Sequence, residues 1–251
     1  RVHRRQRQMC IRDRDYGNCQ VNVLCVVVSI GKMGVPLYFE MLDNNSGNSN
    51  SEDRITLFKQ LIDIIGKDRV DYVVMDREFI GHRWLDWLQS ASIDFCVRVP
   101  KHHTIILADG AYNAEGLLEG SSQCYQTEVW VNKVRVNVSL SYDDEGKLLY
   151  LIGTRKATNL RKMYRKRWGI EVIFQAFKGR GFRLEESGLS DINKYKKLFA
   201  IVSIAYTLCW ATGITDGKEN PVKVKKHGYP QYSVFRSCLL YTSDAADDGL
   251  C

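Results

Sequence analysis

The sequence predicts an α/β domain that is interrupted by a β-rich insertion, and three observations lead to this class. Residues 19–30 form a nearly continuous apolar run rich in β-branched residues, which is typical of a buried strand. Strand and helix patterns then alternate up to residue 99. Between residues 101 and 151 the spacing becomes that of antiparallel hairpins, and long helical patterns follow. The length of 251 residues fits one domain plus such an insertion.

The first elements are predicted to be two paired strands and a helix. The buried strand 19–30 ends at a turn that contains glycine, and residues 35–42 continue as a second strand that pairs with the first. A loop rich in Gly, Asn and Ser follows. It leads into a helix that reaches Ile65, for which Asn50 or Ser51 is available as the N-cap.

The next elements lead from a short strand into the insertion. The strand 70–75 places Asp76 at its C-terminal end, and residues 81–91 follow as an amphipathic helix. Another strand is predicted at 95–99. Alternating valines and the Gly-containing turn 143–146 indicate hairpins in the insertion. The valines are Val129, Val131, Val134, Val136 and Val138.

A helical pattern after the insertion carries the most informative spacing of the chain. On one ideal helix, Tyr164, Arg167, Glu171 and Lys178 fall within about 60° of one another. A single carboxylate is then framed by a phenol, a guanidinium and an ammonium group. A carboxylate suits a divalent metal, whereas Arg and Lys suit phosphates. The alternative is an amphipathic surface helix whose one acid is satisfied by Arg167.

The spacing Tyr-x2-Arg-x3-Glu-x6-Lys at 164–178 resembles the signature around the last acid of the DDE transposases of insertion-sequence group four. Further matches stand in that family's order and, with the signature, cover most of residues 16–236. They are Gly47-Asn48-Ser49-Asn50 before a helix, Val73-Val74-Met75-Asp76-Arg77-Glu78-Phe79, and Ile152-Gly153-Thr154-Arg155 before the signature helix.

The resemblance implies an RNase H-like mixed sheet with flanking helices and a β-rich insertion before the last catalytic acid. It implies metal-dependent DNA cleavage and strand transfer at transposon ends, with Mg²⁺ (or Mn²⁺) as the cofactor. Asp76 and Glu171 are the implied catalytic residues and metal ligands. Tyr164, Arg167 and Lys178 are the implied DNA contacts. The implied partners are transposon terminal repeats and target DNA, with a homodimer formed on DNA and no membrane, in the bacterial cytoplasm at the nucleoid.

Two-metal cleavage of a phosphodiester needs carboxylates that converge from separate elements, and a third acid is expected on a central strand. At this central strand, members of the family carry a motif that resembles Asp-Arg-Thr-x-Trp-x-Tyr/Phe-Gly. Asp15-Tyr16-Gly17 matches only the last positions, and counting back seven from Gly17 puts the expected Asp at position 10, which is Cys10. Asp13 and Asp43 do not match the motif. The simpler interpretation of Asp76 is a carboxylate that caps the next turn.

The two ends of the chain match each other through their coding sequence. Residues 4–13 can be back-translated into a set of codons whose reverse complement encodes residues 238–247. The match resembles the adapter used in transposase-based sequencing libraries, so we expect residues 1–12 and 240–251 to be unpacked. The predicted divisions are 1–14 and 237–251 as adapter-derived ends, 15–100 and 154–236 as the two parts of the catalytic domain, and 101–153 as the β-rich insertion.

The charge of the chain favours a polyanionic partner. Its 36 Lys and Arg outnumber its 29 Asp and Glu, and residues 155–183 hold ten basic residues against the single acid Glu171. Trp168, within this stripe, is expected in the core, with a DNA contact as the alternative. Residues 198–214 are apolar enough to suggest a membrane span, but their length and polar residues favour a buried helix.

Two other functions stay open at this point. One is a metal-dependent nuclease on the same fold that does not transfer strands. The other is an inactive DNA-binding remnant, because we expect a fragment truncated at both ends, in which the first acid and any N-terminal DNA-binding segment are absent. Inverted repeats around an intact gene favour transposition over both.

Overall fold

The computed structural model divides into two compact units, each described here by itself. The first is Arg1–Asp15 with Cys19–Val172, and the second is Tyr16–Asn18 with Ile173–Cys251. The predicted adapter-derived tail, 237–251, lies outside the described residues. The structure describes 5–12, 15–16, 19–20, 22–30, 33–42, 49–179, 181–189, 191–221, 223–226, 231 and 235, with the backbone alone for 5–20 and 185.

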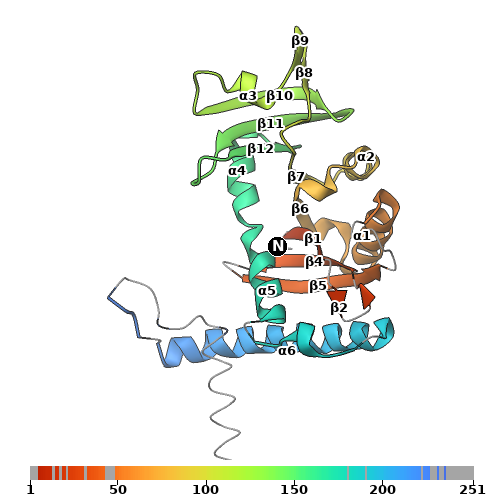
Figure 1. Ribbon diagram of the computed structural model, residues 1–251, viewed down its shortest axis with the longest axis vertical. Helices are drawn as coiled ribbons and strands as arrows, with labels where there is room; N and C mark the ends of the chain where they lie inside the picture. The colour runs from red at the N-terminus through yellow and green to blue at the C-terminus, as the bar shows by residue number, and fades with distance from the viewer. Residues whose placement is uncertain are drawn as a thin grey trace, which may run out of the picture. The chain divides into compact units, whose positions relative to one another are not determined.

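One mixed sheet organises the first unit (Figure 1). Its strand order is β5-β4-β1-β6-β7-β12-β11-β10-β8-β9. β6 runs parallel to both β1 and β7, and the other neighbours are antiparallel. In chain order these strands are β1 (Arg5–Arg12), β4 (Asn22–Ile30), β5 (Met33–Leu42), β6 (Val70–Met75), β7 (Phe95–Arg98), β8 (Ile105–Leu107), β9 (Gly110–Tyr112), β10 (Gln123–Val131), β11 (Val134–Tyr142) and β12 (Leu148–Gly153); β2 (Asp15–Tyr16) and β3 (Cys19–Gln20) are short and lie outside the sheet.

Helices cover both faces of this sheet, because the side chains of β6 alternate between two apolar layers. Val73 and Met75 belong to the core that α1 and α2 complete. Tyr72 and Val74 belong to a separate cluster that α4 covers. Figure 1 shows α1 and α2 on one side and α4 on the other. The helices and turns of this unit are α1 (Ser51–Ile65), η1 (Lys67–Arg69), η2 (Arg77–Phe79), α2 (His82–Ser90), α3 (Ala114–Leu117) and α4 (Ala157–Arg165).

The predicted helix starts and buried faces are confirmed for this part of the chain. Asn50, one of the two candidates, caps α1: its side chain accepts from Asp53 N at 3.0 Å, and the Asp53 carboxylate accepts from Asn50 N at 3.0 Å. In α2 the side chains of Trp84, Leu85 and Leu88 are fully buried, as the amphipathic spacing predicted.

The insertion continues the central sheet. β12 pairs with β7, with Ile152 opposite Val97, and the strands of the insertion follow in antiparallel order. The two-residue turn Asn132–Lys133 closes the β10–β11 hairpin with φ of 48° and 64°. Both residues therefore occupy the left-handed region that two-residue hairpin turns require.

Strand β1 differs from the sequence-based expectation. Residues 1–12 were expected to be unpacked, and this is wrong for the backbone of Arg5–Arg12, which lies between β4 and β6. The pairing has a general physical cause. β4 and β6 would otherwise expose unpaired backbone groups at the centre of the sheet, and any extended segment can satisfy them. The origin of these residues stays a prediction.

The helix predicted to carry Tyr164 through Lys178 is divided into α4 and α5 (Trp168–Lys178), so the prediction of one continuous helix is wrong. Arg167 N donates to Tyr164 O at 2.9 Å, three residues back, which tightens and ends the helical turn. After the break Gly169 lies against β5. A Cβ atom on Gly169 would come within 3.2 Å of Gly34 N, so a side chain there would push α5 away from the sheet.

Helix α6 (Ile192–Glu219) dominates the second unit, after the turn η3 (Leu184–Glu186). Phe177, near the end of α5, packs edge-on against Phe199 and Tyr206, with ring centroids 5.2 and 5.6 Å apart. By length and hydropathy alone α6 could cross a membrane, although 28% of its most apolar window is buried. The expectation of a buried helix at 198–214 is therefore wrong for most of this stretch: one face, with Phe199, Val202 and Tyr206, is buried and the rest is partly or fully exposed. The exposed apolar residues of α6 are Ile201, Ile204, Leu208 and Ile214.

Candidate active site

Asp76 follows directly after β6 and begins the turn η2. Its Oδ1 accepts from Arg77 N at 2.8 Å, and its main-chain oxygen accepts from Phe79 N at 3.0 Å. Asp76 therefore caps the turn, as its simpler interpretation predicted. Its side chain is still 30% exposed and its Oδ2 faces Arg167. Capping thus leaves part of the carboxylate available to other groups.

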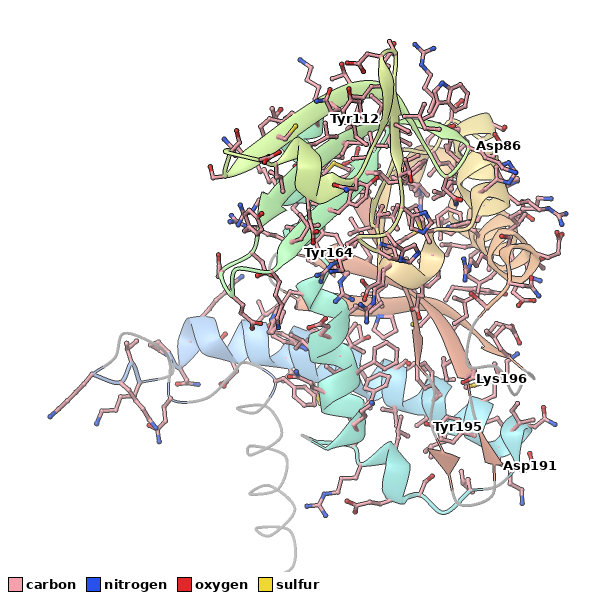
Figure 2. All side chains as sticks on the ribbon, turned by 45° about the horizontal axis from the view of Figure 1, so that its top comes forward. Asp86, Tyr112, Tyr164, Asp191, Tyr195 and Lys196 are labelled. Atoms are coloured by element: carbon pink, nitrogen blue, oxygen red, sulfur yellow. The ribbon has the colours of Figure 1, made fainter. Side chains whose placement is uncertain are left out.

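Three other predicted site residues meet Asp76 or each other in the same place. Tyr164, at the end of α4 and labelled in Figure 2, donates its hydroxyl to Asp76 Oδ1 at 3.2 Å. Arg167, in the break between α4 and α5, lies with Nη1 3.4 Å from Asp76 Oδ2. Its Nη2 contacts Glu171 Oε1 on α5. One guanidinium thus bridges the acid pair, Asp76 and Glu171, and the structure brings together carboxylates from a strand end and a helix.

The electrostatics of this cluster favour a cation. The side chains of Arg167, Asp76 and Glu171 are 16%, 30% and 29% exposed, so their charges interact more strongly than they would in water. Two carboxylates against one guanidinium leave a formal charge of −1. Burial raises the pKa of Tyr164 to about 12; the Arg167 charge opposes this shift, and Asp76 adds to it. The phenol therefore stays protonated and acts as a donor at neutral pH.

The strand register adds a third position beside the acid pair. β1 and β6 run parallel with Met9 opposite Met75, so the next residues along the two strands are Cys10 and Asp76. The family motif, counted along the sequence, points to the same position 10 for the first acid. The sequence spacing and the backbone pairing therefore point to the same position, which is Cys10 and lies in the part of the chain predicted to be adapter-derived.

A divalent metal fits the type of ligand at this site but not the number. Carboxylate oxygens are the ligands that Mg²⁺ and Mn²⁺ prefer, and Asp76 and Glu171 supply them. Within the described ranges, however, no group of three His, Cys, Asp or Glu residues is placed to hold a metal. The acid pair by itself thus supplies two carboxylates, fewer than a metal site of three such residues would have.

Arg54 supports the Asp76 turn from α1, and the sequence analysis missed it. Its side chain is buried, and burial lowers the pKa of Arg54 to about 10. Nη2 donates to Glu78 O at 3.1 Å, Nε donates to Ser49 Oγ at 2.6 Å, and the guanidinium lies 4.7 Å from the Phe79 ring centroid. The sequence did contain a signal for this. Leu57, Phe58 and Leu61 follow Arg54 at i+3, i+4 and i+7, so Arg54 lies on the buried apolar face of α1.

The other basic residues of the predicted DNA-binding stripe divide into bound and exposed ones. Arg155 is bound by Asp71 Oδ1 at 2.6 Å and by Asp94 Oδ2 at 2.8 Å, so it anchors the start of α4. Trp168 was expected in the core and this is wrong, since it is 62% exposed. Lys178 ends α5 in the second unit, and its role stays a prediction. The exposed basic residues in and around α4 are Lys156, Lys162, Arg165 and Lys166.

The strand order β5-β4-β1-β6-β7, with helices on both faces and an acid at the end of β6, defines an RNase H-like domain. Residues 31–208 match the model of the family described as Transposase DDE domain. The chain therefore belongs to the DDE transposase family, as the signature predicted. The match does not decide the insertion-sequence group.

A solved structure supports the fold. The chain is similar to the piggyBac transposase in a cryo-EM structure of its synaptic complex with hairpin DNA, at a TM-score of 0.51 and 10% identity. The similarity covers 96% of this chain and 52% of that one, so the chain spans about half the length of that transposase. Endonuclease V from Bacillus subtilis is a much weaker match, with a TM-score of 0.34 and 8% identity. The similarity covers 81% of this chain and 82% of that one. No curated protein matches the sequence.

Proposed function

We propose that this chain is a catalytic fragment of a DDE transposase that cleaves DNA at transposon ends and joins them to a target. The observation that carries the proposal is the convergence of Asp76 and Glu171 on one guanidinium, beside position 10 in the strand register. The spacing of the site residues resembles insertion-sequence group four, which we propose as the subgroup.

The acid pair would hold Mg²⁺ or Mn²⁺ together with a carboxylate restored at position 10. When bound, the metal supplies Lewis-acid activation of the phosphate and of the attacking hydroxyl. The protein's own part is to orient and to bind. Tyr164 holds Asp76 by a hydrogen bond, and Arg167 keeps the two acids together until a cation replaces its charge.

DNA is the proposed partner, through terminal repeats and target DNA. Tyr164, Arg167 and Lys178 are the proposed contacts to end phosphates, and the exposed basic residues in and around α4 add a positive surface. The synaptic complex of the piggyBac transposase contains hairpin DNA. By analogy we propose a homodimer assembled on DNA and a place at the bacterial nucleoid.

One observation favours a second candidate, an inactive DNA-binding remnant. Position 10 lies beside Asp76 and is Cys10 in this chain, so the expected ligand set lacks one acid. A hard cation that prefers octahedral oxygen ligation binds poorly to such a set. The chain as written should therefore bind DNA through its basic residues and cleave it poorly.

The decisive experiment compares the chain with Cys10→Asp and with the matched control Cys10→Asn, which adds an amide of similar size without a carboxylate. Nicking of plasmid DNA that carries the sequences flanking the gene is measured in Mg²⁺ and in Mn²⁺. We expect cleavage from Cys10→Asp alone.

Each other outcome has a meaning. Equal cleavage by the unmodified chain and Cys10→Asp would reject position 10 as a metal ligand. DNA binding without cleavage by Cys10→Asp would favour the remnant. Nicking without strand joining would favour a nuclease.

A further inference from the structure

The loop after Asp76 is bound by the insertion at a point that the proposed catalytic residues do not use. Asn132, the first residue of the β10–β11 turn, donates its side-chain amide to Ile80 O at 2.5 Å. Ile80 is the residue that ends η2, the turn that Asp76 begins. Asn132 and Ile80 are 52 positions apart in the sequence, so this bond ties two distant elements at the candidate site.

The hairpin turn alone does not explain this bond. At φ 48° an Asn residue is well suited to the turn, and Gly would suit it equally well. The turn does not require a donor that is aimed at another element. The Asn132 side chain is half-buried and points its amide at a main-chain acceptor next to Phe79, which is fully buried.

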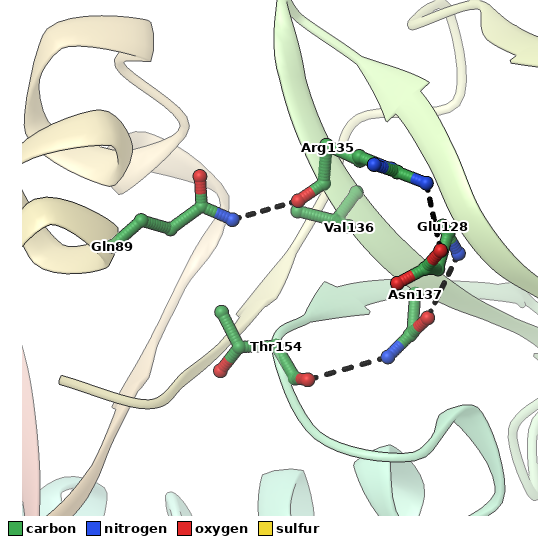
Figure 3. Close-up of a pocket in the computed structure, with 6 residues that line it drawn as sticks. All are labelled: Gln89, Glu128, Arg135, Val136, Asn137 and Thr154. Atoms are coloured by element: carbon green, nitrogen blue, oxygen red, sulfur yellow. Dashed lines mark hydrogen bonds and ion pairs between the residues drawn. The ribbon is translucent and has the colours of Figure 1, made fainter. Parts of the chain in front are cut away.

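Other contacts fix the same hairpin in place. Gln89 of α2 donates its side-chain amide to Arg135 O at 2.7 Å, as Figure 3 shows. Asn137 of β11 donates to Arg155 O at 3.0 Å, at the connection that leads into α4. The hairpin is therefore bound both to the segment that carries Asp76 and to the segment that leads to Tyr164.

We propose that Asn132 is a positioning residue for Asp76, and that the β10–β11 hairpin couples the insertion to the geometry of the acid pair. The amide bond to Ile80 O holds the end of η2. It thereby holds the Asp76 carboxylate at the distance at which Tyr164 and Arg167 contact it. The catalytic meaning of this coupling rests on the proposed function, whereas the coupling itself does not.

The test is amide hydrogen exchange in the full chain at the turn η2. Arg77 N and Phe79 N are both bound by oxygens of Asp76, so they report on its position. Asn132→Gly keeps the backbone conformation of the turn and removes the amide. We expect exchange at these two amides to become about tenfold faster, the size of effect that loss of one hydrogen bond gives, while amides of β4 and β5 keep their rates.

Two further variants separate the bond from the turn. Lys133→Gly is the matched control, because Lys133 has φ 64°, is exposed, and lies in the same turn. It should leave both amides unchanged. Asn132→Asp keeps the size and the left-handed preference, but a carboxylate cannot donate to Ile80 O at neutral pH, so it should behave like Asn132→Gly.

No change in Asn132→Gly, an equal change in Lys133→Gly, or faster exchange throughout the sheet would each overturn the proposal. A second readout concerns function. In the Cys10→Asp chain, Asn132→Gly should lower kcat for cleavage about tenfold and leave the KM for DNA unchanged. If Cys10→Asp does not cleave at all, the proposed function fails while the exchange result stands, so the two failures are distinguishable.

Discussion

An arginine, two carboxylates and a tyrosine meet at each end of strand β6, and the two clusters differ in how tightly the acids are bound. At the start of the strand, Arg155 donates to Asp71 Oδ1 at 2.6 Å and to Asp94 Oδ2 at 2.8 Å, and it lies 4.8 Å from the Tyr72 ring centroid. Thr154 donates to the other Asp94 oxygen at 2.7 Å. We call this the Arg155 cluster.

The Arg167 cluster, at the other end of β6, has the same composition, but its arginine binds the two acids unequally: Nη2 is in close contact with Glu171, whereas the contact with Asp76 is long. Arg167 Nη1 lies 3.4 Å from Asp76 Oδ2, beyond the usual length of an N–H···O bond. The Arg167 guanidinium lies 5.7 Å from the Tyr164 ring centroid.

The difference indicates that the Arg155 cluster stabilises the fold, whereas the Arg167 cluster is the candidate site. Desolvation lowers the pKa of Arg155, but its hydrogen bonds to Asp71 and Asp94 outweigh this and raise it overall. The Arg155 cluster therefore joins β6, β7 and the start of α4. In the Arg167 cluster, Asp76 Oδ1 accepts hydrogen bonds from Arg77 N and Tyr164, whereas Oδ2 has a long ion pair with Arg167, so Oδ2 is the oxygen that a cation can most readily bind.

The largest expected effect is on catalysis, and it tests whether the two clusters differ in function. In the Cys10→Asp chain, Glu171→Gln should lower the rate of DNA nicking by about a thousandfold, because a metal ligand supplies several kcal/mol of transition-state stabilisation. Asp94→Asn, the matched change in the Arg155 cluster, should leave the rate within about threefold at a temperature where both variants are folded. Equal losses would show that the clusters do not differ in function.

Removing each arginine in turn tests whether the Arg155 cluster stabilises the fold more than the Arg167 cluster does. Arg155→Met should lower the free energy of unfolding by about 2 kcal/mol, because it leaves Asp71 and Asp94 without compensation; their partial exposure keeps the loss below that of a fully buried pair. Arg167→Met should cost less, about 1 kcal/mol, because Asp76 keeps its hydrogen bonds from Arg77 N and Tyr164 when the guanidinium is removed. Urea denaturation at pH 7 measures both. A larger loss for Arg167→Met would reverse the assignment.

A pH profile sharpens the comparison further. Burial raises the pKa of both Tyr164 and Tyr72 to about 12, so the folded protein keeps these protons above pH 10, where the unfolded chain releases them. Stability should fall as pH rises from 10 towards 12, by up to about 1.4 kcal/mol per pH unit for each phenol. Tyr164→Phe and Tyr72→Phe should each flatten this decline between pH 10 and 12. An unchanged slope in either variant contradicts the burial of that phenol.

The smallest effect concerns DNA affinity. Arg167→Met should weaken binding about threefold and reduce the dependence of log K on log salt by about one, as loss of a phosphate contact does. Arg155→Met should leave the salt slope unchanged, because Arg155 pairs with Asp71 and Asp94 at the start of β6, away from the acid pair where the end phosphates are proposed to bind. Fluorescence anisotropy at several salt concentrations measures both slopes. A reduced slope for Arg155→Met would place Arg155 at the DNA.

The sequence predicted those parts of the fold and the site that depend on local spacing. The strand that ends at Asp76 and the buried face of α2 follow from periodicity, and the acid pair follows from ordered motifs. The break after Tyr164 did not follow, because helical spacing continues through it, and the close approach of Gly169 to Gly34 of β5 joins segments that are distant in the sequence. The bond of Asn132 to Ile80 O joins segments that only the folded sheet brings together, so no local pattern indicates it.

The pairing of β1 with β6 also sets an order for folding during synthesis. Arg5 pairs with Val70, about 65 positions later, so the centre of the sheet cannot close until β6 has left the ribosome. The β4–β5 hairpin needs only local contacts and can form before then. The strand that brings position 10 to Asp76 therefore finds its partner β6 only after the β4–β5 hairpin can already have formed.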